Sequence, residues 1–174
     1  MRPIKDFQDI ENGGFYFTSD NHEELIYRPK SYMDESLPSG NSIAIGALME
    51  LYELTGLTKY IEAVENAINS AHDSLNRSNS SHSSLLLAAP RTDSSKRLII
   101  IRCEESNLSD NQNLINKLDT LNDNIYFIPN NITLTADGLS DKKPEGNFRA
   151  YICQNNICLE PISSIEKFIE FIQK

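Results

Sequence analysis

The chain of 174 residues has few basic residues, few cysteines and few histidines. Its 16 lysines and arginines stand against 25 aspartates and glutamates, which gives a net charge of −9. Nucleic acid backbones and anionic membrane surfaces attract proteins that present clustered positive charge. The charge therefore argues against nucleic acid and against a membrane as partners.

The chain also has no long apolar run. None approaches the roughly 20 residues that a helix needs to cross a bilayer. The first 14 residues, MRPIKDFQDIENGG, contain no apolar segment typical of a secretory signal. Three cysteines without such a signal indicate a reducing compartment, so we predict a cytoplasmic protein.

Several well-known catalytic patterns are absent. The sequence has no phosphate-binding glycine motif, no Ser–His–Asp order around a nucleophile elbow and no HExxH pattern. The histidines His22, His72 and His82 are scattered and are predicted to lie on the surface, and Cys103 lies far from the other cysteines. We therefore predict no metal site and no cofactor.

Two amphipathic helices are predicted in the first half of the chain. Residues 41–55 carry an apolar stripe and stop at Gly56, and residues 58–76 carry alanines spaced by four. Because only Gly56 and Leu57 separate them, they should form an antiparallel hairpin. Tetratricopeptide units look similar, but no second copy follows at a period of about 34 residues, which disfavours a repeat array.

The second half of the chain alternates between strand and helix patterns. After a Ser-rich break at 77–84 and a short helix at 83–89, we predict strands at 98–101, 126–128, 132–134, 148–153 and 157–159, helices at 109–121 and 164–173, and a loop at 136–147. Ser163 and Glu166 fit a capping box for the last helix. The sequence thus predicts an α+β protein with a boundary near residue 92, dividing 1–91 from 92–174.

A long patterned segment, residues 13–42, precedes the first of the two helices. Gly13-Gly14 predicts a turn, 15–18 a short aromatic strand and 24–27 a return strand, which together would make a β-hairpin. Long loops between core elements are usually functional or disordered, and this segment carries too many aromatic residues to be disordered. The polar side chains that crowd this segment are Arg28, Lys30, Tyr32, Asp34, Ser39, Asn41 and Ser42.

The motifs of this segment and of the C-terminus resemble one family. GGFYFT, RPK, Asp34 and PSGNSIA, in this order, and AYICQNNICLEP at 150–161 look like the C-terminal third of the spermatogenesis-associated protein 20-like, thioredoxin-domain-containing family. The resemblance implies a thioredoxin-like domain first, then a helical toroid similar to N-acylglucosamine 2-epimerases and six-hairpin glycosidases. Residues 1–91 would then be the end of a partial α/α toroid, and 92–174 a small α/β unit. Asn155-Asn156 departs from the family, which tends to place an aromatic residue there.

The polar segment offers candidates for sugar chemistry. Asp34 could act as a catalytic acid or base, because carboxylates do this work on sugars when a neighbouring group sets their charge. The predicted substrate-binding residues are Arg28, Lys30, Tyr32, Ser39 and Asn41. In the alternative interpretation, Arg28 or Lys30 pairs with Asp34 only to fix the loop, and Ser39 to Ser42 cap the helix.

Cys153 and Cys158 are predicted to face each other across a tight hairpin. Three interpretations stay open: reduced structural thiols, a disulfide or redox pair, or half of a metal site. Zinc normally takes four ligands, and no histidine or further cysteine lies near in sequence.

An incomplete toroid would leave an apolar helical face bare. We therefore expect the chain to associate with a separately encoded N-terminal half, or with another copy through this face, and to lend loop residues to a cleft for a sugar ligand. It would then be inactive alone and belong to carbohydrate metabolism. The alternatives are a stand-alone interaction or scaffold module, or a thiol redox role through Cys153 and Cys158. Whether the chain catalyses any reaction stays open.

Overall fold

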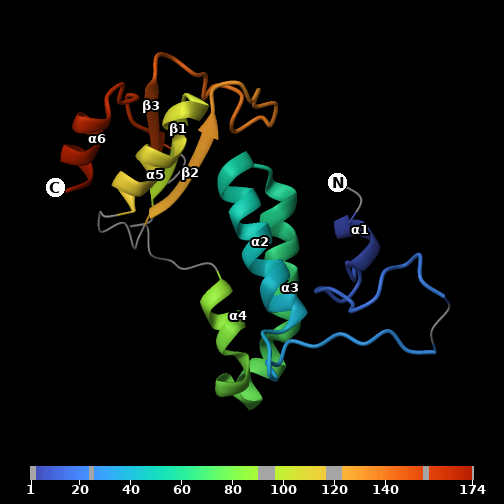
Figure 1. The fold of residues 1–174 in the computed structure, drawn as a ribbon. Helices are drawn as coiled ribbons and strands as arrows, with labels where there is room; N and C mark the ends of the chain where they lie inside the picture. Colours follow the sequence, from blue (N-terminus) through green and yellow to red (C-terminus); the bar gives the residue numbers. More distant parts are fainter. Residues whose placement is uncertain (1–2, 24–25, 90–96, 117–122, 155–156, 174) are drawn as a thin grey trace. The chain divides into compact units, whose positions relative to one another are not determined.

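The computed structural model describes residues 3–23, 26–89, 97–116, 123–154 and 157–173. The fold is α+β, as predicted, with helices first and a mixed sheet with helices later (Figure 1). Internal contacts divide the chain into two compact units. The N-terminal unit comprises Met1–Glu53 and Leu57–Pro90, and the C-terminal unit comprises Leu54–Gly56 and Arg91–Lys174. The boundary predicted near residue 92 lies within 90–96, outside the described residues.

The N-terminal unit is built on the predicted helical hairpin. Helix α2 (Gly40–Thr55) and helix α3 (Thr58–Arg77) lie side by side (Figure 1). Gly56 turns the chain between them with a φ of 68°, a left-handed conformation that glycine adopts without strain. The short helix α1 (Pro3–Phe7) precedes the hairpin, and the 3-10 helix η1 (Asn79–His82) and helix α4 (Ser83–Ala88) follow it.

The core of this unit lies where the two long helices face each other. Ile45 of α2 and Val64 of α3 are fully buried, and Leu85 of α4 joins them. The fully buried alanines Ala67 and Ala71 carry small side chains, which let neighbouring elements approach closely. The facing sides of the hairpin are therefore covered by the chain itself.

The predicted β-hairpin within 13–42 is wrong. Phe15 forms an isolated bridge with Gln8, and no strand covers residues 15–18 or the described residues 26–27. Residues 24–25 lie outside the described residues. The physical reason is that the backbone of Phe15 bonds to the side chain of Asn41 instead of to a partner strand. One backbone bond, from Phe17 N to Pro29 O at 2.9 Å, joins the two arms.

The C-terminal unit contains a four-stranded sheet in the order β2-β1-β3-β4. Its strands are β1 (Arg97–Cys103), β2 (Asp123–Pro129), β3 (Phe148–Gln154) and β4 (Ile157–Cys158). β1 pairs parallel with β2 and antiparallel with β3, and β3 pairs antiparallel with β4. The parallel pair requires a crossover, which carries the 3-10 helix η2 (Glu105–Asn107) and helix α5 (Leu108–Ile115).

One face of this sheet forms a separate core. Alternate residues of β1 and β3 pack with Ile115 of α5 and with Phe168 of α6 (Ile165–Ile172). The fully buried Phe168 ring lies 5.9 Å from the ring of Phe148, centroid to centroid. The C-terminal unit thus closes this face with its own helices.

Three local predictions in this unit need correction. Residues 132–134 are a turn and loop instead of a strand, because Ile132 N bonds back to Pro129 O and its carbonyl accepts from the buried Arg102. Helix α5 ends at Ile115, and residues 117–121 of the predicted 109–121 helix lie outside the described residues. The cap of α6 is Ser164, whose side chain accepts from Lys167 N, and not Ser163.

Candidate functional site

Asp9, which the sequence analysis did not single out, lies at the centre of the polar groups of the N-terminal unit. Its side chain is 6% exposed. It accepts hydrogen bonds from Lys30 Nζ at 2.9 Å, Tyr16 Oη at 2.8 Å and Asn12 N at 2.9 Å. Burial alone would raise the pKa of Asp9, but these donors and the charge of Lys30 hold that pKa well below its usual range. Asp9 is therefore an ionised, fully engaged carboxylate.

Arg28 extends the same cluster. Its guanidinium lies 4.1 Å from the centroid of the Tyr16 ring, donates to Thr18 O at 2.6 Å and pairs with Asp20. The hydrogen bond to Asp9, followed by burial, raises the pKa of Tyr16. Tyr16 is thus fixed by a carboxylate at its hydroxyl and by a cation over its ring.

Two glycines make this arrangement possible. Gly13 and Gly14 have φ values of 76° and 80°, as a glycine turn allows. A Cβ on Gly13 would lie 2.3 Å from Asn66 O of α3, and one on Gly14 would lie 2.0 Å from Tyr32 Oη. The predicted turn is confirmed, and it brings the loop against α3 and against the buried Tyr32. Burial raises the pKa of the Tyr32 hydroxyl.

Asp34 lies at a different point of the loop and contacts neither Arg28 nor Lys30 through a described ion pair. Its two carboxylate oxygens accept from Ser39 N at 3.0 Å and from Ser84 N at 2.8 Å. Bonding to the Ser84 amide, and then to the Ser39 amide, lowers the pKa of Asp34. The predicted pairing of Asp34 with Arg28 or Lys30 is wrong, because Asp20 and Asp9 take those cations. Asp34 instead connects the loop to the first turn of α4.

Asn41 and Ser39 connect the loop to α2. Asn41 Oδ1 accepts from Phe15 N at 2.7 Å, and its Nδ2 donates to Phe15 O and to Ser31 O, each at 2.9 Å. Ser39 Oγ accepts from Ser42 N at 3.1 Å, as a helix cap does. The capping predicted for this segment is present. The Asn41 side chain bonds to the N–H and the C=O of Phe15, as a neighbouring strand would.

An open, mainly apolar groove of about 490 Å³ lies beside this cluster. One wall is a stripe of α2 whose members recur at helical spacing, and the other comes from α1 and the aromatic residues of the loop. Its floor along α2 begins with small residues, which leaves room for a helix to approach. The lining residues are Ile4, Phe7, Phe15, Tyr16, Phe17, Ser31, Gly40, Asn41, Ala44, Ala47, Leu48 and Leu51.

The structure therefore brings together four of the six predicted site residues. Arg28, Lys30, Tyr32 and Asn41 gather around Asp9 and Phe15, whereas Ser39 caps α2 and Asp34 bonds to Ser84 N of α4. The roles predicted for them in substrate binding and catalysis stay predictions. Asp9 could have been found from its turn chemistry, since its Oδ1 accepts from Glu11 N and Asn12 N just before Gly13-Gly14. Among the described ranges, no group of three or more histidines, cysteines and acids could hold a metal ion.

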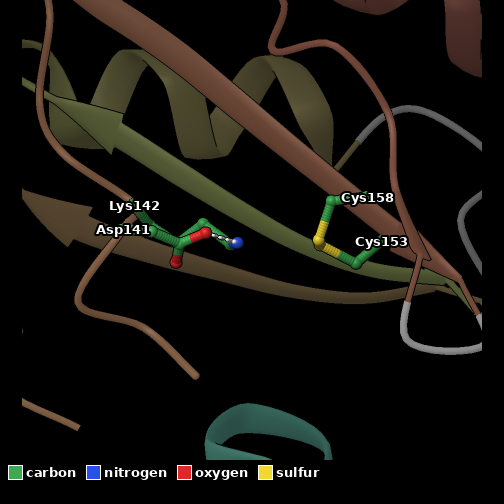
Figure 2. Close-up of a disulfide and its surroundings, with 4 residues drawn as sticks. All are labelled: Asp141, Lys142, Cys153 and Cys158. Carbon is green, nitrogen blue, oxygen red and sulfur yellow. Dashed lines mark hydrogen bonds and ion pairs between the residues drawn. A yellow bond between two sulfur atoms is a disulfide. The ribbon is translucent and has the colours of Figure 1, made fainter. Parts of the chain in front are cut away.

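The remaining residues that the sequence analysis singled out are the cysteines and histidines. Cys153 and Cys158 form a disulfide (Figure 2), and Cys103 is buried, which raises the pKa of its thiol. His22 and His72 are exposed, as predicted. The surface prediction for His82 is wrong: its ring is fully buried and lies 2.9 Å from Ser74 Oγ and 2.6 Å from Ser78 O.

Among known proteins, the chain is similar to an uncharacterized protein of Caenorhabditis elegans. The two are 26% identical over 178 aligned positions, which cover all of this chain. The chain spans about a quarter, 24%, of the length of that relative. No family model and no solved structure matches the chain.

The described helices offer no candidate for a membrane span. None of them combines the length and the apolar character that crossing a bilayer requires.

Proposed function

We propose that this chain is the C-terminal part of a thioredoxin-domain-containing protein similar to the spermatogenesis-associated protein 20-like family. In this proposal the N-terminal unit ends a sugar-epimerase-like toroid of paired helices, and the chain is inactive alone. An amphipathic helix from the preceding part of the whole protein occupies the groove beside α2. That part is either joined to this chain or encoded separately, and the assembly works in the cytoplasm.

The groove is the observation that carries the proposal. Its lining is mainly apolar, and Phe17, a large hydrophobic side chain of that lining, is 81% exposed. Burying apolar surface stabilises a protein by roughly 25 cal/mol per Å². A helix with an apolar stripe would therefore gain stability by docking here, and Gly40, Ala44 and Ala47 leave space for its backbone.

The length of the relative supports the same interpretation. Because this chain aligns with only about a quarter of the Caenorhabditis elegans protein, most of that protein lies outside the aligned region. The motifs GGFYFT, RPK and PSGNSIA also fit the C-terminal third of the proposed family. A partner helix from the rest of such a protein is thus the occupant that we propose.

The sugar cleft is the second part of the proposal. Lys30 and Tyr16 bond to the ionised Asp9 close to the groove, and Arg28 lies over the Tyr16 ring. Tyr16 and Asn41 also line the groove. We propose that the completed assembly presents this cluster, with Tyr32, Ser39 and Asp34 fixing the loop, at the mouth of a carbohydrate-type cleft. Asp34 is the proposed acid or base of that cleft, and its bonds to Ser39 N and Ser84 N hold it in place.

A reconstitution experiment tests the docking. The coding sequence upstream of Met1 is read for the thioredoxin-like and helical parts, and these are coexpressed with this chain. We expect a one-to-one complex that Ala47→Glu abolishes and that Asn69→Glu, at an exposed position of α3, leaves intact. An upstream region that encodes nothing of this kind, or a complex indifferent to Ala47→Glu, would contradict the proposal.

A second candidate function is a stand-alone scaffold module. The fully buried Ile45, Val64 and Ala67 favour it, because the hairpin already buries its facing sides without a partner. In that case a separate protein would supply the helix for the groove. A cooperatively unfolding, monodisperse chain that captures no upstream product would favour this candidate.

A further inference from the structure

The Cys153–Cys158 disulfide joins two directly paired residues of β3 and β4. The next pair along is hydrogen-bonded, with Leu159 N donating to Ile152 O at 2.8 Å. Cys153 and Cys158 therefore form a non-hydrogen-bonded pair, in which opposing side chains are closest. Cys158 is exposed, whereas Cys153 is 8% exposed. An external reagent thus meets the sulfur of Cys158 first.

A buried lysine lies on the same face of the sheet. Tyr151 and Cys153 are two residues apart on β3, so their side chains share a face. Lys142 Nζ lies 5.6 Å from the centroid of the Tyr151 ring, and its side chain is 7% exposed. Figure 2 shows the Lys142 side chain extending from its loop toward the disulfide. Its ammonium donates to Asp141 Oδ2 at 2.7 Å, and the Asp141 side chain is largely exposed.

The other groups on this face add positive charge. Arg149 lies 5.7 Å from the same tyrosine ring, and Arg102 on β1 is its cross-strand partner. Among the described residues, the charged or titratable groups of this face are Lys142, Asp141, Arg149, Glu145, Arg102, Tyr151 and Tyr126. Glu145 forms an ion pair with Arg149, so three cations stand against two carboxylates. A thiolate at Cys153 would be formed in an environment with more cations than anions, which favours the ionised sulfur.

We propose that Cys153 and Cys158 form a redox-active disulfide that exchanges with an external dithiol, and that Lys142 stabilises the Cys153 thiolate. Cys158 is the attacked sulfur and Cys153 the leaving one. This proposal goes beyond the proposed function, because it concerns only the C-terminal unit and needs no toroid.

A thiolate of the external dithiol attacks Sγ of Cys158, the Cys153–Cys158 bond breaks, and its electron pair remains on Sγ of Cys153 as a thiolate. The first sulfur of the dithiol is now bonded to Sγ of Cys158 in a mixed disulfide. The second thiolate of the dithiol attacks that first sulfur and releases Cys158 as a thiolate, which takes a proton from water. The dithiol is oxidised to a disulfide, and the protein pair is reduced by two electrons.

The predicted compartment favours a reactive disulfide over a structural one. In a reducing cytoplasm, which the sequence predicts, protein disulfides in mesophiles are usually transient and serve catalysis or redox sensing. Exposed disulfides are also the labile ones, whereas buried structural disulfides resist reduction. Because Cys158 is exposed, we expect the Cys153–Cys158 disulfide to be readily reduced.

The test measures reduction and alkylation cysteine by cysteine on the whole folded chain. Dithiothreitol is the dithiol probe, and mass spectrometry of alkylated peptides separates Cys153, Cys158 and Cys103. We expect the disulfide to form under mild oxidation and to be reduced reversibly while the chain stays folded. In the reduced chain, Lys142→Met should raise the pH midpoint for alkylation of Cys153 by about 1 unit.

Two further variants separate charge from structure. Lys142→Arg keeps the positive charge and should restore the midpoint, and Lys143→Met, at the exposed neighbouring lysine, should leave it unchanged. The variant Cys153→Ser should trap a mixed disulfide at Cys158 with a thiol reagent, whereas Cys158→Ser should trap far less at Cys153. Freely alkylated Cys153 and Cys158 after mild oxidation, or the same midpoint in Lys142→Met and the native chain, would overturn the proposal.

Discussion

The N-terminal and C-terminal units bury their apolar residues in different ways. In the C-terminal unit, α5 and α6 cover one face of the sheet, and Phe168 and Ile115 are fully buried there. In the N-terminal unit, the hairpin buries its facing sides, but α2 keeps a second apolar stripe open as a groove. Most of the exposed large hydrophobic side chains also belong to the N-terminal unit. The difference supports the proposal that a partner covers the groove of the N-terminal unit.

The two units also differ in how their backbones are held. Regular strand pairing sets the register of β1, β2 and β3, whereas the segment 13–42 is held by isolated backbone bonds and by side chains that bond to backbone groups. Such bonds depend on single residues, each of which can be removed. The loop is therefore easier to disrupt than the sheet, and substitutions can test the two units separately.

The largest expected effect breaks the C-terminal core. Phe168→Ala should lower the free energy of unfolding of this unit by about 4 kcal/mol, because it removes a fully buried ring and leaves a cavity. Hydrogen exchange should speed up in β1 and β3 and stay unchanged in α2 and α3. As a control, Phe17→Ala should cost less than about 0.5 kcal/mol, since Phe17 is mainly exposed. Equal acceleration in α2 and α3 would show that the two cores are not separate.

The next effect concerns the loop of the N-terminal unit. Asp9→Asn should cost about 3 kcal/mol, because it leaves the ammonium of Lys30 without its buried counter-charge. Chemical denaturation measures the loss in the free energy of unfolding. Hydrogen exchange should then show faster exchange in α2 and α3. The neighbouring exposed acid offers a control, and Glu11→Gln should change stability little. Equal losses of stability in Asp9→Asn and Glu11→Gln would contradict the central role that we give to Asp9.

Acid should weaken the N-terminal unit through the same carboxylate. The pKa of Asp9 is lower in the folded chain than in the unfolded one, so its contribution is complete above the unfolded pKa of about 3.9 and is lost as pH falls below that value. Unfolding measured between pH 7 and pH 2 should show a fall below about pH 4 that Asp9→Asn reduces, while the part due to Asp34, whose pKa is also lowered, remains. An identical acid profile in the variant would contradict this origin.

The smallest expected effect tests a helix end in the C-terminal unit. Ser164→Ala should cost about 1 kcal/mol because it removes the oxygen that accepts from Lys167 N. Ser163→Ala is the matched control and should have almost no effect. Thermal unfolding of both variants distinguishes the observed cap from the one that the sequence suggested. A larger loss of stability in Ser163→Ala than in Ser164→Ala would show that Ser163 is the cap.

Elements with local signals were predictable, and those fixed by distant residues were not. The stripes of α2 and α3, Gly56, the apolar run of β1 and the hairpin of β3 and β4 depend on residues near one another in sequence, and their positions agree with prediction. The aromatic segment at 15–18 also has the local pattern of a strand, but Asn41, 26 residues away, takes its backbone bonds. Burial of His82 likewise depends on Ser74 and on the turn of η1, which no periodicity reports.

The candidate site shows the same limit. The segment that carries Arg28, Lys30, Tyr32 and Asn41 was identified from its crowding of polar groups, but its central carboxylate was not. Asp9 precedes the segment by only a few residues and belongs to no recognisable catalytic motif. Partners within a loop are decided by its three-dimensional path, and so Lys30 meets Asp9 instead of Asp34.

The bare groove beside α2 is the central claim, and binding of the dye 1-anilinonaphthalene-8-sulfonate to the native chain tests it most directly. We predict saturable binding at one site on the folded chain, loss of that binding in Ala47→Glu, and full binding in Asn69→Glu. A folded chain that binds no dye, or one whose binding survives Ala47→Glu unchanged, would contradict the account.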